Sequence, residues 1–183
     1  MNTYLDDERV VLTLDAGGTN LVFSAIRGGE EITDPLILRT EPHDLNESLA
    51  LIEKGFARIR EIAEGKAEAI SFSFPGPSDY RKGIIGNLPN LPAFRGGVAL
   101  GPFLSKSFGL PVYINNDGNL FALGEWIGGL LPEVNRRLAE AGSTKRFRNL
   151  LGLTLGSGFG AGIVVDGHVV DRKSTRLNSS HYS

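Results

Sequence analysis

The sequence predicts an α/β fold, because short apolar strands and amphipathic helices alternate along the chain. Residues 10–14 and 21–26 are two apolar, β-branched runs joined by a glycine turn, the pattern of a β-hairpin. Residues 45–63 then repeat apolar side chains at intervals of three and four, which predicts a helix with one buried face. Residues 150–155 and 161–165 repeat the strand, glycine turn and strand of the first hairpin.

The remaining elements follow from turn residues and helix ends. Gly28 and Gly29 are expected to form the turn before a third strand. The first helix is expected to be capped by Asp44 or Asn46 and to end at Gly65. In chain order we expect strands at 32–38 and 69–74, an ordered loop at 83–97, a helix at 98–108, a strand at 111–114, a turn at 115–118, a helix from about 119, and helix followed by loop at 132–148.

Composition excludes several classes of protein. The 183 residues carry a net charge of −2, so no basic surface for nucleic acid or for an anionic membrane is expected. There is no cysteine, which excludes a disulfide scaffold, a thiol nucleophile and cysteine-bound zinc within these residues. The N-terminus lacks the basic and apolar segments of a secretion signal, and no apolar run approaches the ~18 residues that span a bilayer. A cytoplasmic protein is therefore expected, with no nucleic-acid or membrane partner.

The last residues, 171–183, differ in character from the rest of the chain. They are polar, show no periodicity and follow an incomplete β segment at Val169 and Val170. Two interpretations stay open for this tail: sequence foreign to the natural protein, or a natural disordered segment.

The first glycine turn, residues 15–20, is a candidate phosphate site. Gly17 and Gly18 let successive backbone N–H groups point at one spot, which a phosphate oxygen can occupy, and Thr19 adds a hydroxyl donor. Asp15 stands at the strand end and can hold Mg²⁺ through water or phosphate, since Mg²⁺ takes few carboxylates and keeps its waters. The alternative is a plain hairpin turn, because a short glycine motif alone is weak.

The second glycine turn has the same composition. Gly156, Ser157, Gly158 and Gly160 combine backbone donors with a hydroxyl. No Gly-Lys-Ser/Thr follows, which excludes a Walker loop, and the next element is a strand, which excludes a Rossmann fingerprint. A β-bulge or tight turn remains the alternative.

Asn116 and Asp117 lie between an apolar strand and a helix. Asp117 is the candidate general base that takes a proton from a sugar hydroxyl during phosphoryl transfer, and Asn116 can hydrogen-bond to sugar hydroxyls. Alternatively, Asp117 is only the N-cap of the following helix, and the two roles do not exclude each other.

Two further loops are candidates for the sugar side. Asn90, in a proline-rich loop before Phe94, can present its amide to a sugar, and Gly76 follows a strand where backbone can approach a ligand. A surface turn and a strand terminator are the alternatives.

Taken in order, these motifs resemble those of the ROK family (repressor, open reading frame, kinase), in particular its bacterial glucokinases and N-acetylhexosamine kinases. The resemblance covers about residues 8–170. It rests on segments 15–19, 74–77, 89–94, 116–117, 122–125 and 155–160.

The resemblance implies an actin-like, ribonuclease H-like ATPase fold in which two α/β lobes close over ATP and sugar. Residues 1–118 would form the N-terminal lobe, 119–170 the connecting helix and the start of the second lobe, and 171–183 the tail. It also implies that 15–19 and 156–160 bind the phosphates of ATP with Mg²⁺, that Gly76, Asn90, Asn116 and Asp117 contact a hexose, and that Asp117 is the base.

The chain also departs from the family pattern. Phe94 stands where the family often has tryptophan, and the zinc-binding cysteines and the Glu-x-Gly-His sugar motif are absent. Zinc is therefore expected only in a full-length parent, and the 183 residues alone are expected to be inactive. The resemblance suggests a homodimer.

Two alternative functions remain. Sugar-responsive repressors of the same family carry a helix-turn-helix domain before the first phosphate turn, for which residues 1–9 offer no room. An actin-like assembly ATPase or chaperone would not need the sugar-side residues Asn90 and Asn116.

Overall fold

The computed structural model describes residues 6–76, 78–88, 91–155 and 159–170. It consists of two compact units, Met1–Asn116 and Asp117–Ser183. Among the described residues, every helix is too short or too polar to cross a membrane.

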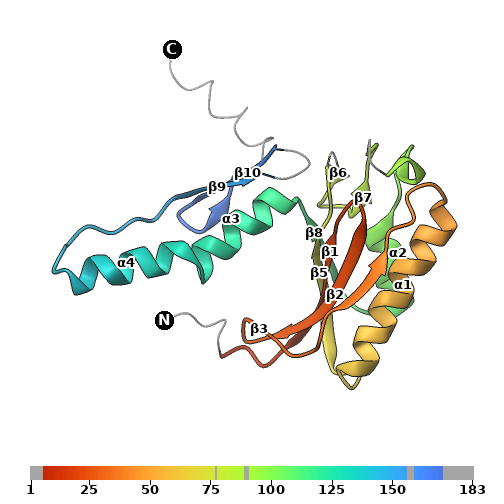
Figure 1. Cartoon of the computed structure of the whole chain (residues 1–183), viewed down its shortest axis with the longest axis horizontal. Coiled ribbons are helices and arrows are strands. Elements are labelled where there is room, and N and C mark those ends of the chain that lie inside the picture. Colours follow the sequence, from red (N-terminus) through yellow and green to blue (C-terminus); the bar gives the residue numbers. More distant parts are fainter. Residues whose placement is uncertain (1–5, 77, 89–90, 156–158, 171–183) are drawn as a thin grey trace, which may run out of the picture. The chain divides into compact units, whose positions relative to one another are not determined.

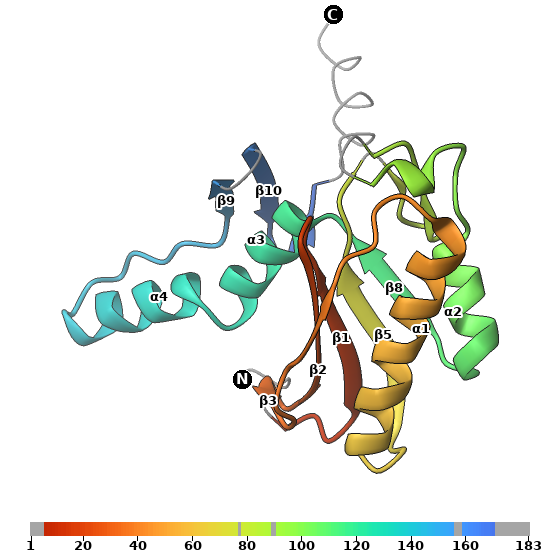
Figure 2. The same ribbon diagram turned by 45° about the vertical axis from the view of Figure 1, so that its right-hand side comes forward.

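The first unit is built on a mixed six-stranded sheet. Its strands run in the order β3-β2-β1-β5-β8, and β4 also pairs with β2. β1 pairs with β2 in an antiparallel hairpin, whereas β1, β5 and β8 are parallel and lie side by side (Figures 1 and 2). The strand bounds are β1 Val10–Ala16, β2 Asn20–Arg27, β3 Glu30–Glu31, β4 Leu36–Arg39, β5 Ala67–Ser73 and β8 Val112–Asn115.

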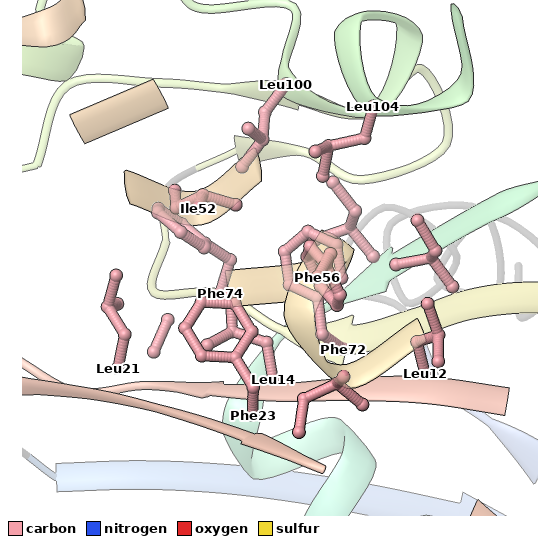
Figure 3. Packing of buried hydrophobic residues seen from close by; sticks show 14 of the residues in the cluster. Leu12, Leu14, Leu21, Phe23, Ile52, Phe56, Phe72, Phe74, Leu100 and Leu104 are labelled. Carbon is pink, nitrogen blue, oxygen red and sulfur yellow. The ribbon is translucent and has the colours of Figure 1, made fainter. Parts of the chain in front are cut away.

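Helices α1 (Leu45–Ile62) and α2 (Leu100–Phe108) cover one face of this sheet (Figure 2). The carboxylate of Asp44 caps α1 by accepting the N–H of Glu47, so the first of the two predicted caps is correct. Gly109 ends α2 at a φ of 67°, in the left-handed region that favours glycine. Figure 3 shows the core between helices and sheet, where Phe56 is fully buried against Phe23.

The predicted third strand at 32–38 is only partly correct. The chain forms β3 after a turn at Gly28 and Gly29, whose φ values are 59° and 83°, and then β4 from Leu36. Pro35 separates the two, since proline has no N–H for a sheet ladder. The loop predicted at 83–97 contains β7 (Ile84–Ile85), which pairs with β6 (Ser78–Asp79), and the 3₁₀ turn η1 (Pro92–Phe94).

The second unit contains α3 (Asp117–Ile127), α4 (Leu130–Glu140) and a sheet in the order β11-β10-β9. Its strands are β9 Leu150–Leu155, β10 Phe159–Val165 and β11 His168–Val169. The prediction of a turn through residue 118 is wrong, because α3 begins at Asp117. The acidic side chain accepts the N–H of Gly118, and negative charge is favourable at a helix N-terminus.

The two faces of the β9–β10 ladder differ. On one face, Gly152, Gly162 and Val164 are buried, and a Cβ added at Gly152 would lie 2.9 Å from the Cβ of Ala122 in α3. On the other face six large apolar side chains are exposed: Leu151, Leu153, Leu155, Phe159, Ile163 and Val165.

Candidate functional site

Three parallel strands of the first unit end at the same edge of the sheet. The register pairs Asp15 with Ser73 and Ser73 with Asn115. Neighbouring strands lie about 4.8 Å apart, so these polar residues form one row across the carboxyl ends. The residues one step earlier face the opposite way and are buried: Leu14, Phe72 and Ile114. Ligands of open α/β sheets bind at this kind of edge.

Backbone and side-chain hydrogen bonds fix the first glycine turn beside this row. The N–H of Gly17 donates to the carbonyl oxygen of Asn20 at 3.0 Å. Thr40, just after β4, donates its N–H to the carbonyl oxygen of Thr19 at 2.9 Å and its hydroxyl to that of Gly17 at 3.1 Å. The turn therefore has a defined shape before any ligand binds.

Gly18 leaves open space above this turn. It is exposed, its φ is outside the left-handed region, and a Cβ added there would meet nothing within 4 Å. Neither backbone conformation nor packing among the described residues requires glycine here. A glycine at position 18 would, however, allow a ligand to approach the backbone closely.

The ends of β5 and β8 bring Gly76 and Asn116 together. The N–H of Phe74 donates to the carbonyl oxygen of Asn115 at 3.0 Å, which joins the two chain segments where the strands end. A Cβ added at Gly76 would lie 3.8 Å from the amide nitrogen Nδ2 of Asn116. The exposed backbone of Gly76 and the half-buried amide of Asn116 thus form one polar site.

In the second unit, the start of α3 lies against β10. Gly118 contacts the strand so closely that an added Cβ would be 2.8 Å from the backbone nitrogen of Ala161. A Cβ added at Gly160 would lie 4.0 Å from the Cα of Gly118. Asp117 begins this helix, and its Oδ1 accepts the N–H of Gly118 at 2.9 Å. The acidic residue and the end of the second glycine turn are therefore neighbours.

The carboxylates of Asp15 and Asp117 are both exposed. Neither forms an ion pair with an arginine or lysine in the described part of the chain. Within those residues there is also no group of three or more His, Cys, Asp or Glu that could enclose a metal ion. A single carboxylate such as Asp15 fits Mg²⁺ held mainly by water and phosphate oxygens, but not a metal held by protein ligands alone.

The structure groups the described candidates into three sets: Asp15 with Gly17, Gly18 and Thr19; Gly76 with Asn116; and Asp117 with Gly160. Asn90, Gly156, Ser157 and Gly158 lie outside the described residues. Sequence reasoning missed Ser73 and Asn115, the row partners of Asp15, and the brace Thr40. Ser73 and Asn115 each end a strand, and Thr40 follows one. The strand pattern of the sequence alone could therefore have indicated all three as candidate site residues.

Comparison with known proteins shows to which family the chain is related. The model of the ROK family matches residues 11–173. The solved structure of a glucokinase from Parabacteroides distasonis is 61% identical and superimposes with a TM-score of 0.82, over 91% of this chain and 47% of that one. The N-acetyl-D-glucosamine kinase of Photobacterium profundum is 33% identical over 156 residues, 85% of this chain and 46% of that protein.

Transcriptional repressors are also among the relatives. The xylose repressor of Caldicellulosiruptor bescii is 33% identical over 117 residues, 63% of this chain and 25% of that protein.

The chain spans about half the length of the curated kinases that it matches. It has the actin-like ATPase fold of the ROK sugar kinases, as predicted. Strands, turns and family match lead to one assignment: this chain belongs to the ROK family.

Proposed function

We propose that the protein containing this chain is a cytoplasmic kinase that transfers the γ-phosphoryl group of ATP to a hexose, either glucose or N-acetylglucosamine. The observation that carries the proposal is the exposed carboxylate of Asp117, which forms no ion pair with a described arginine or lysine, follows Asn116 in the chain and lies near Gly160. The 61% identity to a glucokinase supports the choice of reaction.

The phosphates of ATP would bind at the two glycine turns. The open space over Gly18 and the fixed shape of the Gly17–Thr19 backbone support phosphate binding at the first turn. The second turn would contribute Gly156, Ser157, Gly158 and Gly160. Asp15 would hold Mg²⁺ through its waters, and the ion would supply positive charge that neutralises the phosphates.

The sugar would contact Gly76, Asn90 and Asn116. Asp117 would accept the proton of the attacking hydroxyl while that oxygen forms a bond to the γ-phosphorus. The bond from the γ-phosphorus to the bridging oxygen of ADP breaks in the same step, so the products are the sugar phosphate, ADP and a protonated Asp117.

The 183 residues alone are proposed to be inactive. A general base contributes about 10²–10⁴ in rate, or roughly 3–5.5 kcal/mol. Holding two reactants in register contributes about 7–11 kcal/mol. The chain spans about half the length of its curated relatives, and the residues that the other half would supply therefore outweigh the retained base.

The test is Asp117→Asn in the full-length protein. We expect kcat to fall at least about a hundredfold, with sugar binding by calorimetry largely retained, because asparagine keeps an oxygen that accepts the N–H of Gly118. Asp166→Asn is the matched control, since Asp166 is an exposed carboxylate in the β10–β11 turn. Loss of sugar binding with unchanged kcat would show that Asp117 is a ligand and not the base.

A sugar-responsive repressor is the second candidate, favoured by the xylose repressor among the relatives. A coupled assay of sugar-dependent ADP release separates the two functions. Sugar binding without ADP release from the full-length protein would favour the repressor.

A further inference from the structure

We propose that Tyr80 is a positioning residue for the sugar side of the site, acting through the backbone of Phe74 and Gly76. This inference rests on the proposed function, because it assigns Tyr80 to the site that would hold the hexose. Tyr80 belongs to none of the motifs on which the family resemblance rests.

The turn that carries Tyr80 is tightly anchored. Tyr80 follows β6, and the N–H of Gly83 donates to its carbonyl oxygen at 3.2 Å, which closes the β6–β7 turn. Gly83 has a φ of 64° and packs on α2, where the N–H of Gly101 donates to its carbonyl oxygen at 2.9 Å. The Tyr80 ring itself packs, partly buried, against the hydrophobic core. Its hydroxyl therefore has a fixed position.

That hydroxyl holds the end of β5. Tyr80 Oη donates to the carbonyl oxygen of Phe74 at 3.0 Å, while the N–H of Phe74 donates to the carbonyl oxygen of Asn115. The peptide groups on both sides of Phe74 are thus bound, one to the β6–β7 turn and the other to β8. The chain continues from this clamp to Gly76.

Tyr80 Oη also faces Gly76. A Cβ added at Gly76 would lie 2.8 Å from Tyr80 Oη, whereas its next neighbours, Asn116 Nδ2 and the nitrogen of Ser78, would be at 3.8 Å. The φ of Gly76 is outside the left-handed region, so space and not backbone conformation requires glycine. The hydroxyl of Tyr80 is the atom that takes this space.

These contacts make a specific prediction for catalysis. Removing the hydroxyl frees the carbonyl oxygen of Phe74 and loosens Gly76 beside the Asn116 amide, so sugar binding should weaken. The phosphate turn at Gly17 is braced separately by Thr40, so ATP binding should not change. A role in stability alone would not distinguish the two substrates.

The experiment is steady-state kinetics of the full-length protein with Tyr80→Phe, Gly76→Ala and the double variant. We expect Tyr80→Phe to raise the KM for the sugar about three- to tenfold, which corresponds to the loss of one hydrogen bond. The KM for ATP and kcat should stay unchanged. Tyr113→Phe is the matched control, because Tyr113 is 62% exposed on β8.

The double variant tests the contact itself. Gly76→Ala alone should push its new Cβ against Tyr80 Oη and raise the KM for the sugar. In the Tyr80→Phe background that oxygen is gone, so Gly76→Ala should raise the KM for the sugar little further. The effects of the two substitutions should therefore not be additive. Equal effects of Gly76→Ala in both backgrounds, an unchanged KM for the sugar in Tyr80→Phe, or a parallel rise in the KM for ATP would each overturn the proposal. If the unchanged protein phosphorylates no hexose, the proposed function itself fails.

Discussion

The two units are stabilised in different ways. In the first unit one sheet face packs on α1 and α2, and every residue of the hydrophobic core cluster belongs to this unit. In the second unit the sheet contacts α3 through glycines, and its outer face is apolar and exposed, with Leu155 at 85% and Phe159 at 71%. The first unit therefore has a core of its own, whereas the second has close backbone packing but little buried side-chain volume.

The largest expected effect compares a phenylalanine from each unit. Phe56 is fully buried, with its ring centroid 5.2 Å from that of Phe23 and 5.6 Å from that of Phe72. Phe56→Ala should lower the free energy of unfolding by about 3–5 kcal/mol. Phe159→Ala should change it by less than about 0.5 kcal/mol, since that ring is exposed. Urea unfolding followed by circular dichroism checks both, and equal losses would refute the comparison.

The next effect concerns two glycines of α3. Gly118→Ala forces a Cβ against the backbone of Ala161, and such overpacking should cost about 1–3 kcal/mol. Gly124→Ala is the matched variant, because its Cβ would meet nothing within 4 Å. In a helix interior, alanine should stabilise by about 0.5–1 kcal/mol relative to glycine. Thermal melts should thus shift in opposite directions, and a shift of the same sign would show that helix propensity, not packing on β10, dominates.

Gly18→Ala separates stability from ligand binding in the first unit. Because its Cβ would meet no described atom, the melting temperature should stay unchanged. If a phosphate approaches this turn, the KM for ATP in the full-length protein should rise about tenfold, equivalent to one good hydrogen bond. A KM for ATP that does not change would remove the first turn from the nucleotide site.

The smallest effect is the pH dependence of α4. Hydrogen bonds from Arg136 and then Arg137 lower the pKa of Glu133 from 4.5 to about 2. A lowered pKa stabilises the folded state above pH 4.5, and this contribution disappears as the pH falls through about 2. Glu133→Gln should therefore melt slightly earlier at pH 6, and the two melting curves should converge near pH 2. The ion pair between Arg136 and Glu133 is exposed to solvent, which weakens it. A large difference in melting temperature between the two proteins at pH 6 would therefore contradict this interpretation.

The sequence predicted elements wherever a local pattern determines them. The strand at 150–155 has the predicted bounds, and the first helix ends within a residue of the prediction, at Ile62. α3 begins at Asp117, before the predicted residue 119, and Gly118 at this start packs on Ala161, a contact between residues far apart in the chain. Local propensity cannot contain such a contact.

The same distinction applies to the candidate site. Asp15 lies near the end of β1, Thr19 follows β1 and Asn116 follows β8, so their place was predictable from the strand pattern. The row that joins Asp15 to Ser73 and Asn115 depends on the register of parallel strands, which pairs residues some 40–60 positions apart. Tyr80 was missed because its hydroxyl reaches Phe74 only after the β6–β7 turn has formed.

The leucine-rich outer face of β9 has a practical consequence. In the sheet as described, β9 is an edge strand, and its segment Leu150–Leu155 carries no charge and no proline. Uncharged edge strands of this kind template pairing with other chains and lead to aggregation. A purified preparation of the 183 residues should therefore be checked for its state of association by light scattering before any lack of activity is ascribed to missing catalytic groups.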